Sequence, residues 1–220
     1  MTSRTSISGR RRSCAAALLG LSLVMVAGCS GGGTTPGATA APAPPSASAS
    51  PSASPSASPT PTAAYKPADA SGKAQNVPVP ELPEAAKAET KEGAIAFTKH
   101  WYTLLNYAYQ TGDFGPMDEV TSASCRMCAK VRPGILEWNA DNRWIAGGLV
   151  NPKGAYTQFV KTIEGNYQVT TQLEQSSGFL HRADGSIEKS VPASQVLADI
   201  LILRFDEDHW TALDVDRLGA

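Results

Sequence analysis

Residues 30–64 limit where this chain can fold, because they contain only Gly, Ser, Thr, Pro and Ala and include eight of the sixteen prolines. No charged or large apolar side chain occurs in them, so the stretch cannot bury enough surface to offset the entropy lost on ordering. The repeat PSAS at 51–54 and 55–58 favours extended polyproline II segments. We predict a tether with a reach on the order of 100 Å when it is fully extended.

The 28 residues before Cys29 have the organisation of a secretory signal peptide. A basic patch at 10–12 precedes an apolar run at 14–27, which is too short to span a bilayer because about 20 apolar residues are needed. The run ends in VAGC, which resembles the lipobox of bacterial lipoproteins. This resemblance implies cleavage after Gly28 and a lipid on Cys29, which would anchor the chain to the cell membrane on its outer side. The alternative is an ordinary signal peptide followed by a chance cysteine.

Cleavage would also change the charge of the chain. The signal peptide at 1–28 contains four of the 19 basic residues and none of the 20 acidic ones, which leaves a net charge of −5 with histidine neutral. Nucleic-acid binding favours a basic surface, so we expect no nucleic-acid partner. The partners that we expect are the membrane, through the lipid on Cys29, and either a protein of the cell envelope or a small apolar ligand.

After the lipid-anchored tether at 29–64, the chain divides into a proline-rich segment and one domain. Residues 65–83 include NVPVPELP, in which proline alternates with apolar residues, and we expect either a linker or an arm packed on the domain. Residues 84–220 are enough for one domain with its own hydrophobic core.

Helical patterns open this domain. Apolar residues recur at steps of three and four over 84–111, which predicts one long amphipathic helix ending before Gly112. Helical spacing returns over 128–138, but Pro133 and Gly134 lie inside this segment and should kink or split it.

After Gly147 the apolar pattern changes to the period of two that is typical of strands. The dipeptide Asp184-Gly185 is a strong hairpin signal between two of these strands. The expected strands are 156–163, 167–174, 179–182, 186–190, 196–205 and 210–217. Helices followed by antiparallel strands predict an α+β domain, in which the N-terminal helices pack on a curved antiparallel sheet.

The segment FTKHWYTLLNYAYQTGDFGPMDEV at 97–120 resembles the opening of the nuclear-transport-factor-two-like (SnoaL-like) cone fold. This resemblance implies a long helix, a Gly-Asp turn and a second helix before a strongly bent sheet. The wider stretch from YKPADASGKAQ through CRMC to WIAGG is similar to an uncharacterised domain family of actinobacterial lipoproteins. Proteins with a cone fold include enzymes that use Asp or His in the cone and domains that only bind, so the fold does not decide the function.

Cys125 and Cys128 would be the two remaining cysteines of the mature domain. Cys14 leaves with the signal peptide and Cys29 carries lipid, so outside the cytoplasm we expect the pair to form a structural disulfide. Thiol–disulfide catalysts use the same spacing, but they place it after a strand and at a helix N-terminus, whereas a helical pattern precedes it here. Zinc would need two further ligands, and the histidines are scattered singly. We expect no metal and no cofactor.

A pocket inside the cone is the alternative site. His100 precedes Trp101 on the long predicted helix, and Asp113 is a conceivable carboxylate partner for His100 as a general base. The alternatives are a histidine in solvent or at the edge of the core, and a tryptophan that packs the helix. The acids at 206–208 could bind calcium, but such clusters are usually solvated. No established catalytic motif occurs, so we assign no catalytic residue.

The favoured function is a non-catalytic binding or adaptor domain at the cell envelope. The sequence marks the anchor, the tether and a small domain well, whereas it does not mark catalytic groups. The first alternative is a pocket in the cone that binds or converts a small apolar molecule. The second alternative is a thiol–disulfide protein that uses Cys125 and Cys128. Whether the protein is an enzyme stays open, and the sequence favours a role without catalysis.

Overall fold

The computed structural model describes residues 63–219 of the chain. The predicted signal peptide, Cys29 and nearly all of the predicted tether lie outside these residues. The described elements are the 3-10 helix η1 (Glu84–Lys87), the helices α1 (Lys91–Thr111), α2 (Gly115–Asp118) and α3 (Arg126–Asn139), and the strands β1 (Trp144–Gly147), β2 (Val150–Tyr156), β3 (Tyr167–Gln175), β4 (Gly178–His181), β5 (Ile187–Val191), β6 (Ser194–Asp206) and β7 (His209–Arg217).

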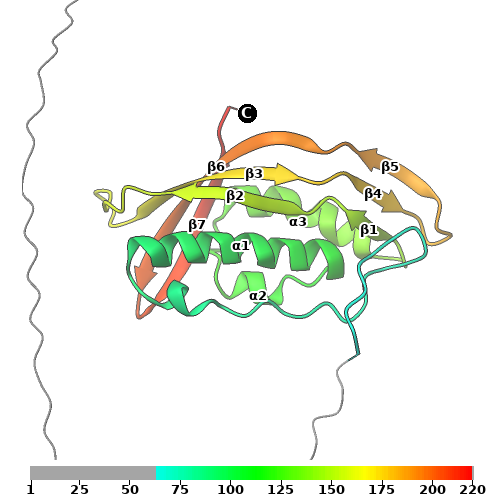
Figure 1. Ribbon diagram of the computed structural model, residues 1–220, viewed down its shortest axis with the longest axis horizontal. Helices are drawn as coiled ribbons and strands as arrows, with labels where there is room; N and C mark the ends of the chain where they lie inside the picture. The colour runs from blue at the N-terminus through cyan, green and yellow to red at the C-terminus, as the bar shows by residue number, and fades with distance from the viewer. Residues whose placement is uncertain (1–62, 220) are drawn as a thin grey trace, which may run out of the picture. The chain divides into compact units, whose positions relative to one another are not determined.

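The strands form two antiparallel sheets, ordered β1-β4-β5 and β2-β3-β6-β7. Each strand of the smaller sheet is joined to one of the larger sheet by only two residues, at 148–149, 176–177 and 192–193. The two sheets therefore follow each other as one bent layer, α1 and α3 pack against it, and α2 packs on α1 (Figure 1). This arrangement confirms the predicted α+β class.

The long helix predicted over 84–111 is divided by Thr90. Thr90 has an extended backbone, and its side-chain oxygen accepts a hydrogen bond of 2.9 Å from the backbone nitrogen of Gly93, so α1 begins at Lys91. A Cβ on Gly93 would lie 2.1 Å from the carbonyl oxygen of Ala88, so only glycine lets the preceding segment approach so closely. A single helix was the wrong prediction because the apolar period continues through this cap.

The end of α1 lies where the sequence predicts it. Gly112 has φ 76°, in the left-handed region that glycine adopts most easily, and its nitrogen donates a hydrogen bond to the carbonyl of Ala108. The predicted split of the next helix does not occur, because α3 continues through Pro133 and Gly134. Buried side chains on both sides of Pro133 hold the two halves of α3 against the core.

Most strand predictions are confirmed, including β3, the hairpin of β4 and β5, and the pair of β6 and β7. The strand predicted at 156–163 is wrong, because β2 ends at Tyr156 and residues 157–166 form the connection to β3. Phe159 in this connection has φ 56°, which a regular strand does not allow. The sequence did not predict β1.

Part of the proline-rich segment packs on the domain, as the cyan arm in Figure 1 shows. The backbones of Lys66 and Gln75 exchange two hydrogen bonds of 2.9 and 3.0 Å, so the arm folds back on itself. The indole nitrogen of Trp144 on β1 donates a hydrogen bond of 2.8 Å to the carbonyl oxygen of Asp69. These contacts attach the arm to the smaller sheet.

Candidate functional site

Large side chains fill the space between α1 and the larger sheet. Trp210 on β7 is in the middle of an aromatic cluster, with ring centroids at 4.9 Å from Phe205, 5.4 Å from Tyr167 and 6.3 Å from Phe97. The largest side chains that are almost fully buried are Trp101, Trp210, Tyr102, Phe97, Leu104, Met117, Leu173, Leu201 and Leu203. They pack as one hydrophobic core.

One polar contact lies within this core. The hydroxyl of Tyr102 donates a hydrogen bond of 2.9 Å to Asp199, and Arg217 pairs with the same carboxylate from the next strand. Burial raises the pKa of Tyr102, and the negative charge of Asp199 raises it further, so the hydroxyl keeps its proton and acts as a donor. The charge of the buried carboxylate is therefore balanced by the guanidinium of Arg217.

The hydroxyl groups of Thr98 and Thr171 are buried in the same layer. Neither has a hydrogen-bond partner within the described residues. Thr171 on β3 is the register partner of Asp199 on β6, so the two side chains are neighbours on one face of the sheet. The core thus contains a small polar patch with unused hydrogen-bonding groups.

The three residues of the predicted pocket do not converge. His100 and Trp101 are buried on α1, whereas Asp113 is exposed beyond its end. Asp113 lies in the turn after α1, and no hydrogen bond joins it to His100 within the described residues. Trp101 donates its indole hydrogen to Thr121 at 2.9 Å.

His100 is only 5% exposed, so it is not a solvated histidine. Burial lowers its pKa below 6.5, which favours the neutral imidazole. Asp113 accepts hydrogen bonds from the hydroxyl of Tyr107 at 3.2 Å and from the backbone nitrogen of Gly115 at 2.8 Å. Asp113 thus shapes the turn before α2, and the general-base pair is not assembled.

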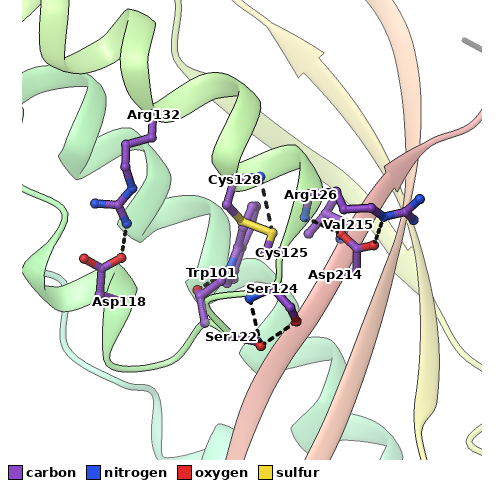
Figure 2. Close-up of a disulfide and its surroundings, with 11 residues drawn as sticks. Trp101, Asp118, Ser122, Ser124, Cys125, Arg126, Cys128, Arg132, Asp214 and Val215 are labelled. Carbon is purple, nitrogen blue, oxygen red and sulfur yellow. Dashed lines mark hydrogen bonds and ion pairs between the residues drawn. A yellow bond between two sulfur atoms is a disulfide. The ribbon is translucent and has the colours of Figure 1, made fainter.

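The disulfide joins Cys125 to Cys128 at the start of α3, with 5.3 Å between the two Cα atoms (Figure 2). Cys125 is the N-cap of α3, and its sulfur accepts a hydrogen bond of 3.3 Å from the backbone nitrogen of Cys128. The residues before Cys125 are attached to β7, because the backbone nitrogen of Ser122 donates a hydrogen bond of 2.8 Å to the carbonyl oxygen of Ala212. The bond therefore fixes the entry of α3.

A helix N-terminus at the cysteine pair was not predicted from the sequence, and it is a feature of thiol–disulfide catalysts. Both cysteines are nevertheless buried, with Cys125 only 1% and Cys128 8% exposed. The nearby Arg126 is held by Asp214 at 2.6 Å and by Asp216 at 2.8 Å, as Figure 2 shows for Asp214. A hollow of about 510 Å³ lies beside the bond. The arrangement fits a structural link better than an accessible reactive thiol.

A second hollow, called here the α3 groove, lies between α3 and the smaller sheet and has a volume of about 330 Å³. It belongs to the size range of small-molecule sites. The lining residues are Tyr109, Lys130, Val131, Gly134, Ile135, Trp138, Ile145, Gly148, Gln175, Gly178, Phe179, Leu180 and Val191. Its walls are thus mainly apolar, and they come from α1, α3 and the strands of both sheets.

Two aromatic side chains border the α3 groove. Trp138 on α3 is half-buried, and the guanidinium of Arg143 lies 5.1 Å from the centroid of its ring. Phe179 on β4 is 39% exposed and lines the same hollow. Gln175 donates its side-chain amide to the carbonyl of Gly148 at 2.9 Å. This apolar surface is the candidate functional site.

Sequence reasoning missed the α3 groove. Its two walls are about 40 residues apart along the chain, and the Pro133-Gly134 pair was interpreted only as a break in the helix. The signal that points to it is Gly134, whose lack of a side chain leaves space on the same helix face as Trp138.

The described residues contain no group of three or more His, Cys, Asp or Glu side chains that is arranged to hold a metal ion. The acids at 206–208 form the turn between β6 and β7, in which residues 207 and 208 have positive φ angles. Within residues 63–219, no helix has both the length and the apolar character that crossing a bilayer requires.

Residues 63–216 match the model of a family that is described as a family of unknown function (DUF6318). The match includes the helices, both sheets, the disulfide and the α3 groove. Comparison with curated proteins gave no match.

Two solved structures are distantly similar. The intermembrane space region of the chloroplast protein ARC6 has 12% identity and a TM-score of 0.37, over 56% of this chain and 92% of that chain. The protein Aln2 from a Streptomyces species has 9% identity and a TM-score of 0.35, over 55% of this chain and 88% of that chain. At these TM-scores, neither similarity carries an argument about function.

Proposed function

We propose that this chain, which belongs to the family of unknown function DUF6318, is a membrane-anchored lipoprotein that holds a non-catalytic binding or adaptor domain outside the cytoplasm. In this proposal Cys29 carries the lipid, residues 29–64 form the tether and residues 84–220 form the binding domain. The basic patch, the short apolar run and VAGC support the anchor. The motif at 97–120 supports a relationship with the SnoaL-like cone fold, as part of the same proposal.

The binding role rests on one observation. Side chains fill the interior between α1 and the larger sheet, while an apolar groove of about 330 Å³ lies on the outside, beside α3. A surface with an exposed Phe179 and a half-buried Trp138 is costly to leave in water, and such surfaces commonly mark binding sites. The α3 groove is therefore the surface that we assign to the partner.

An enzymatic pocket in the interior has less support. Its candidate acid–base pair is not assembled, because His100 is buried on α1 whereas the exposed Asp113 bonds to Tyr107. A thiol–disulfide role also has less support, because Cys125 and Cys128 are buried. The nearby Arg126 is already paired with two carboxylates. Neither alternative has a set of groups that could act together on a substrate.

Mass spectrometry of the mature protein tests the anchor. We expect the N-terminal peptide to begin at Cys29 and to carry a lipid, and we expect external protease to reach the domain on intact cells. Changing Cys29→Ser should release the protein or leave uncleaved precursor. A mature wild-type protein without lipid on Cys29 would contradict the anchor.

Photo-cross-linking in living cells tests the binding role. A photoreactive amino acid at Phe179 should give a discrete product, and the mass of the product reports whether the occupant is a protein or a small molecule. The same amino acid at the exposed Lys99 on α1 is the control and should give no such product. If position 179 gives no product, or only the products that position 99 also gives, the binding role of the α3 groove is contradicted.

A further inference from the structure

Lys130 gives the α3 groove a charged end. It lies four residues before Gly134 and eight before Trp138, so the three residues are on one face of α3. Lys130 forms no ion pair within the described part of the chain, although several other surface cations do. No acidic residue is among those that line the α3 groove. The groove is therefore apolar along its length and positive beside Lys130.

Tyr109 brings a second polar group to the α3 groove. Tyr109 at the end of α1 also lines the α3 groove. Burial raises the pKa of its hydroxyl, while the positive charge of Arg217 acts in the opposite direction. The hydroxyl thus keeps its proton near a guanidinium group and is available as a hydrogen-bond donor. Among the lining residues Lys130 is the one that carries a charge, so the groove favours an anion over a cation.

Gly134 leaves space in the wall of the groove. A glycine inside a helix is about 1 kcal/mol less favourable than alanine. A Cβ at this position would have no neighbour within 4 Å, so packing does not exclude a larger residue here. The missing side chain keeps open a space that an occupant could fill.

The smaller sheet does not favour an added peptide strand. Its two edge strands, β1 and β5, have only four and five residues, and β5 carries Glu188 and Lys189 and pairs with β4 through an irregular register. Pro192 follows β5 and cannot donate a backbone hydrogen bond. Short edges with charges and bulges are the usual protection against strand addition. A small molecule fits this surface better than an extended peptide.

We propose that the α3 groove binds an organic anion with an apolar body, such as an acyl or aromatic carboxylate. Its charged group pairs with Lys130, and its carbon skeleton lies between Trp138 and Phe179. This inference rests on the proposed binding function and specifies the class of ligand. The apolar body supplies most of the binding free energy through buried surface, while Lys130 selects the charge.

Decanoate is the probe, with decanol as its neutral analogue. The full chain carries Cys29→Ser and is kept free of detergent, so that neither a lipid nor a micelle competes with the probe. Titration calorimetry should detect decanoate binding, and decanol should bind about tenfold more weakly, which corresponds to about 1.4 kcal/mol for the lost ion pair. Nuclear magnetic resonance should place the largest shift changes at Trp138 and Phe179.

Three variants separate the parts of the α3 groove. Gly134→Leu should weaken decanoate at least about tenfold, because its side chain occupies the space that the ligand needs. Lys130→Gln should weaken decanoate about tenfold and leave decanol unchanged. Lys99→Gln removes a similar charge from α1 and should change neither affinity. If Gly134→Leu does not fold, Phe179→Ser on the partly exposed wall replaces it with the same expectation.

Failure of this inference is distinguishable from failure of the proposed function. The inference is wrong if wild-type protein binds no decanoate at millimolar concentration, or if Gly134→Leu and Phe179→Ser leave the affinity unchanged. A protein cross-linked at Phe179, without any decanoate binding, would support the binding role and contradict the proposal of an anionic ligand. Equal affinities for decanoate and decanol would overturn the role of Lys130.

Discussion

The hydroxyl of Tyr102 on α1 and the carboxylate of Asp199 on β6 are joined by a hydrogen bond of 2.9 Å, and each residue is only 1% exposed. Their positions are 97 residues apart in the sequence, so the bond fixes the helix to the sheet at one depth and one register. A buried carboxylate is stable only when it is paired and hydrogen-bonded, and here Arg217 and Tyr102 share that role.

Removing the hydroxyl by Tyr102→Phe should therefore lower the free energy of unfolding by about 2 kcal/mol. Asp199 would keep Arg217 but lose its buried donor. Chemical denaturation measures the loss. A change within experimental error of zero would mean that water or Arg217 replaces the hydroxyl.

A substitution at the neighbouring Thr171 should have the opposite effect on stability. Its hydroxyl is buried without a hydrogen-bond partner in the described residues, so Thr171→Val should raise the stability by about 1 kcal/mol at nearly constant volume. The same unfolding titrations measure it. Destabilisation would show that the hydroxyl is bonded in solution, for example to a buried water.

The disulfide should contribute only modestly to stability. It closes a loop with a sequence separation of 3, so the entropy that it removes from the unfolded chain is small. The double variant Cys125→Ser, Cys128→Ser should still fold, with a loss of about 1–2 kcal/mol in the free energy of unfolding.

Alkylation under native conditions and insulin reduction complete this test. We expect no free thiol before reduction and no catalysis of insulin reduction, because both cysteines are buried. A thiol that becomes reactive at low pH, together with insulin reduction, would instead favour the thiol–disulfide alternative.

Local sequence chemistry explains the parts of the fold that could be predicted. The hairpin at Asp184-Gly185 forms because Gly185 has φ 85° and the side chain of Asp184 accepts a hydrogen bond from the nitrogen of Ser186. The prediction of a strand at 156–163 was wrong because it relied on apolar residues such as Val160 and Ile163, which are 69% and 99% exposed in the loop. The sequence alone does not show whether such apolar side chains are buried.

The candidate site could not be predicted for a related reason. His100 and Trp101 on the predicted helix were grouped with Asp113 in the turn after it, whereas the structure buries the first two and leaves Asp113 exposed. The α3 groove is lined by segments that are distant in sequence, including those that carry Trp138 and Phe179. No sequence motif around Lys130 predicts that it lines a groove.

Burial of His100 predicts a pH dependence. Its pKa is lowered from 6.5 by burial, so the folded protein resists protonation of this imidazole more than the unfolded chain does. Above the unfolded pKa both states are neutral at this position and stability does not change with pH. As the pH falls from 6.5 toward the folded pKa, the unfolded state binds the proton first, and stability decreases.

Unfolding titrations from about pH 8 to about pH 5.5 measure this decrease, whose slope is at most about 1.4 kcal/mol per pH unit for one group. His100→Gln should flatten it, whereas His209→Gln changes an exposed histidine and should not. An identical slope in wild type and His100→Gln would show that His100 is not protonated differently in the two states.

Two helical glycines should respond to alanine with opposite signs. At Gly134 a Cβ meets no neighbour within 4 Å, so Gly134→Ala should raise the free energy of unfolding by about 0.5–1 kcal/mol through helix propensity. At Gly93 the same methyl group would lie 2.1 Å from the carbonyl oxygen of Ala88, so Gly93→Ala must displace the segment before α1 and should destabilise the protein. Denaturant unfolding of both variants gives the comparison directly. A destabilised Gly134→Ala would mean that the space in the α3 groove is closed in solution, and it would remove the reason for placing a ligand there.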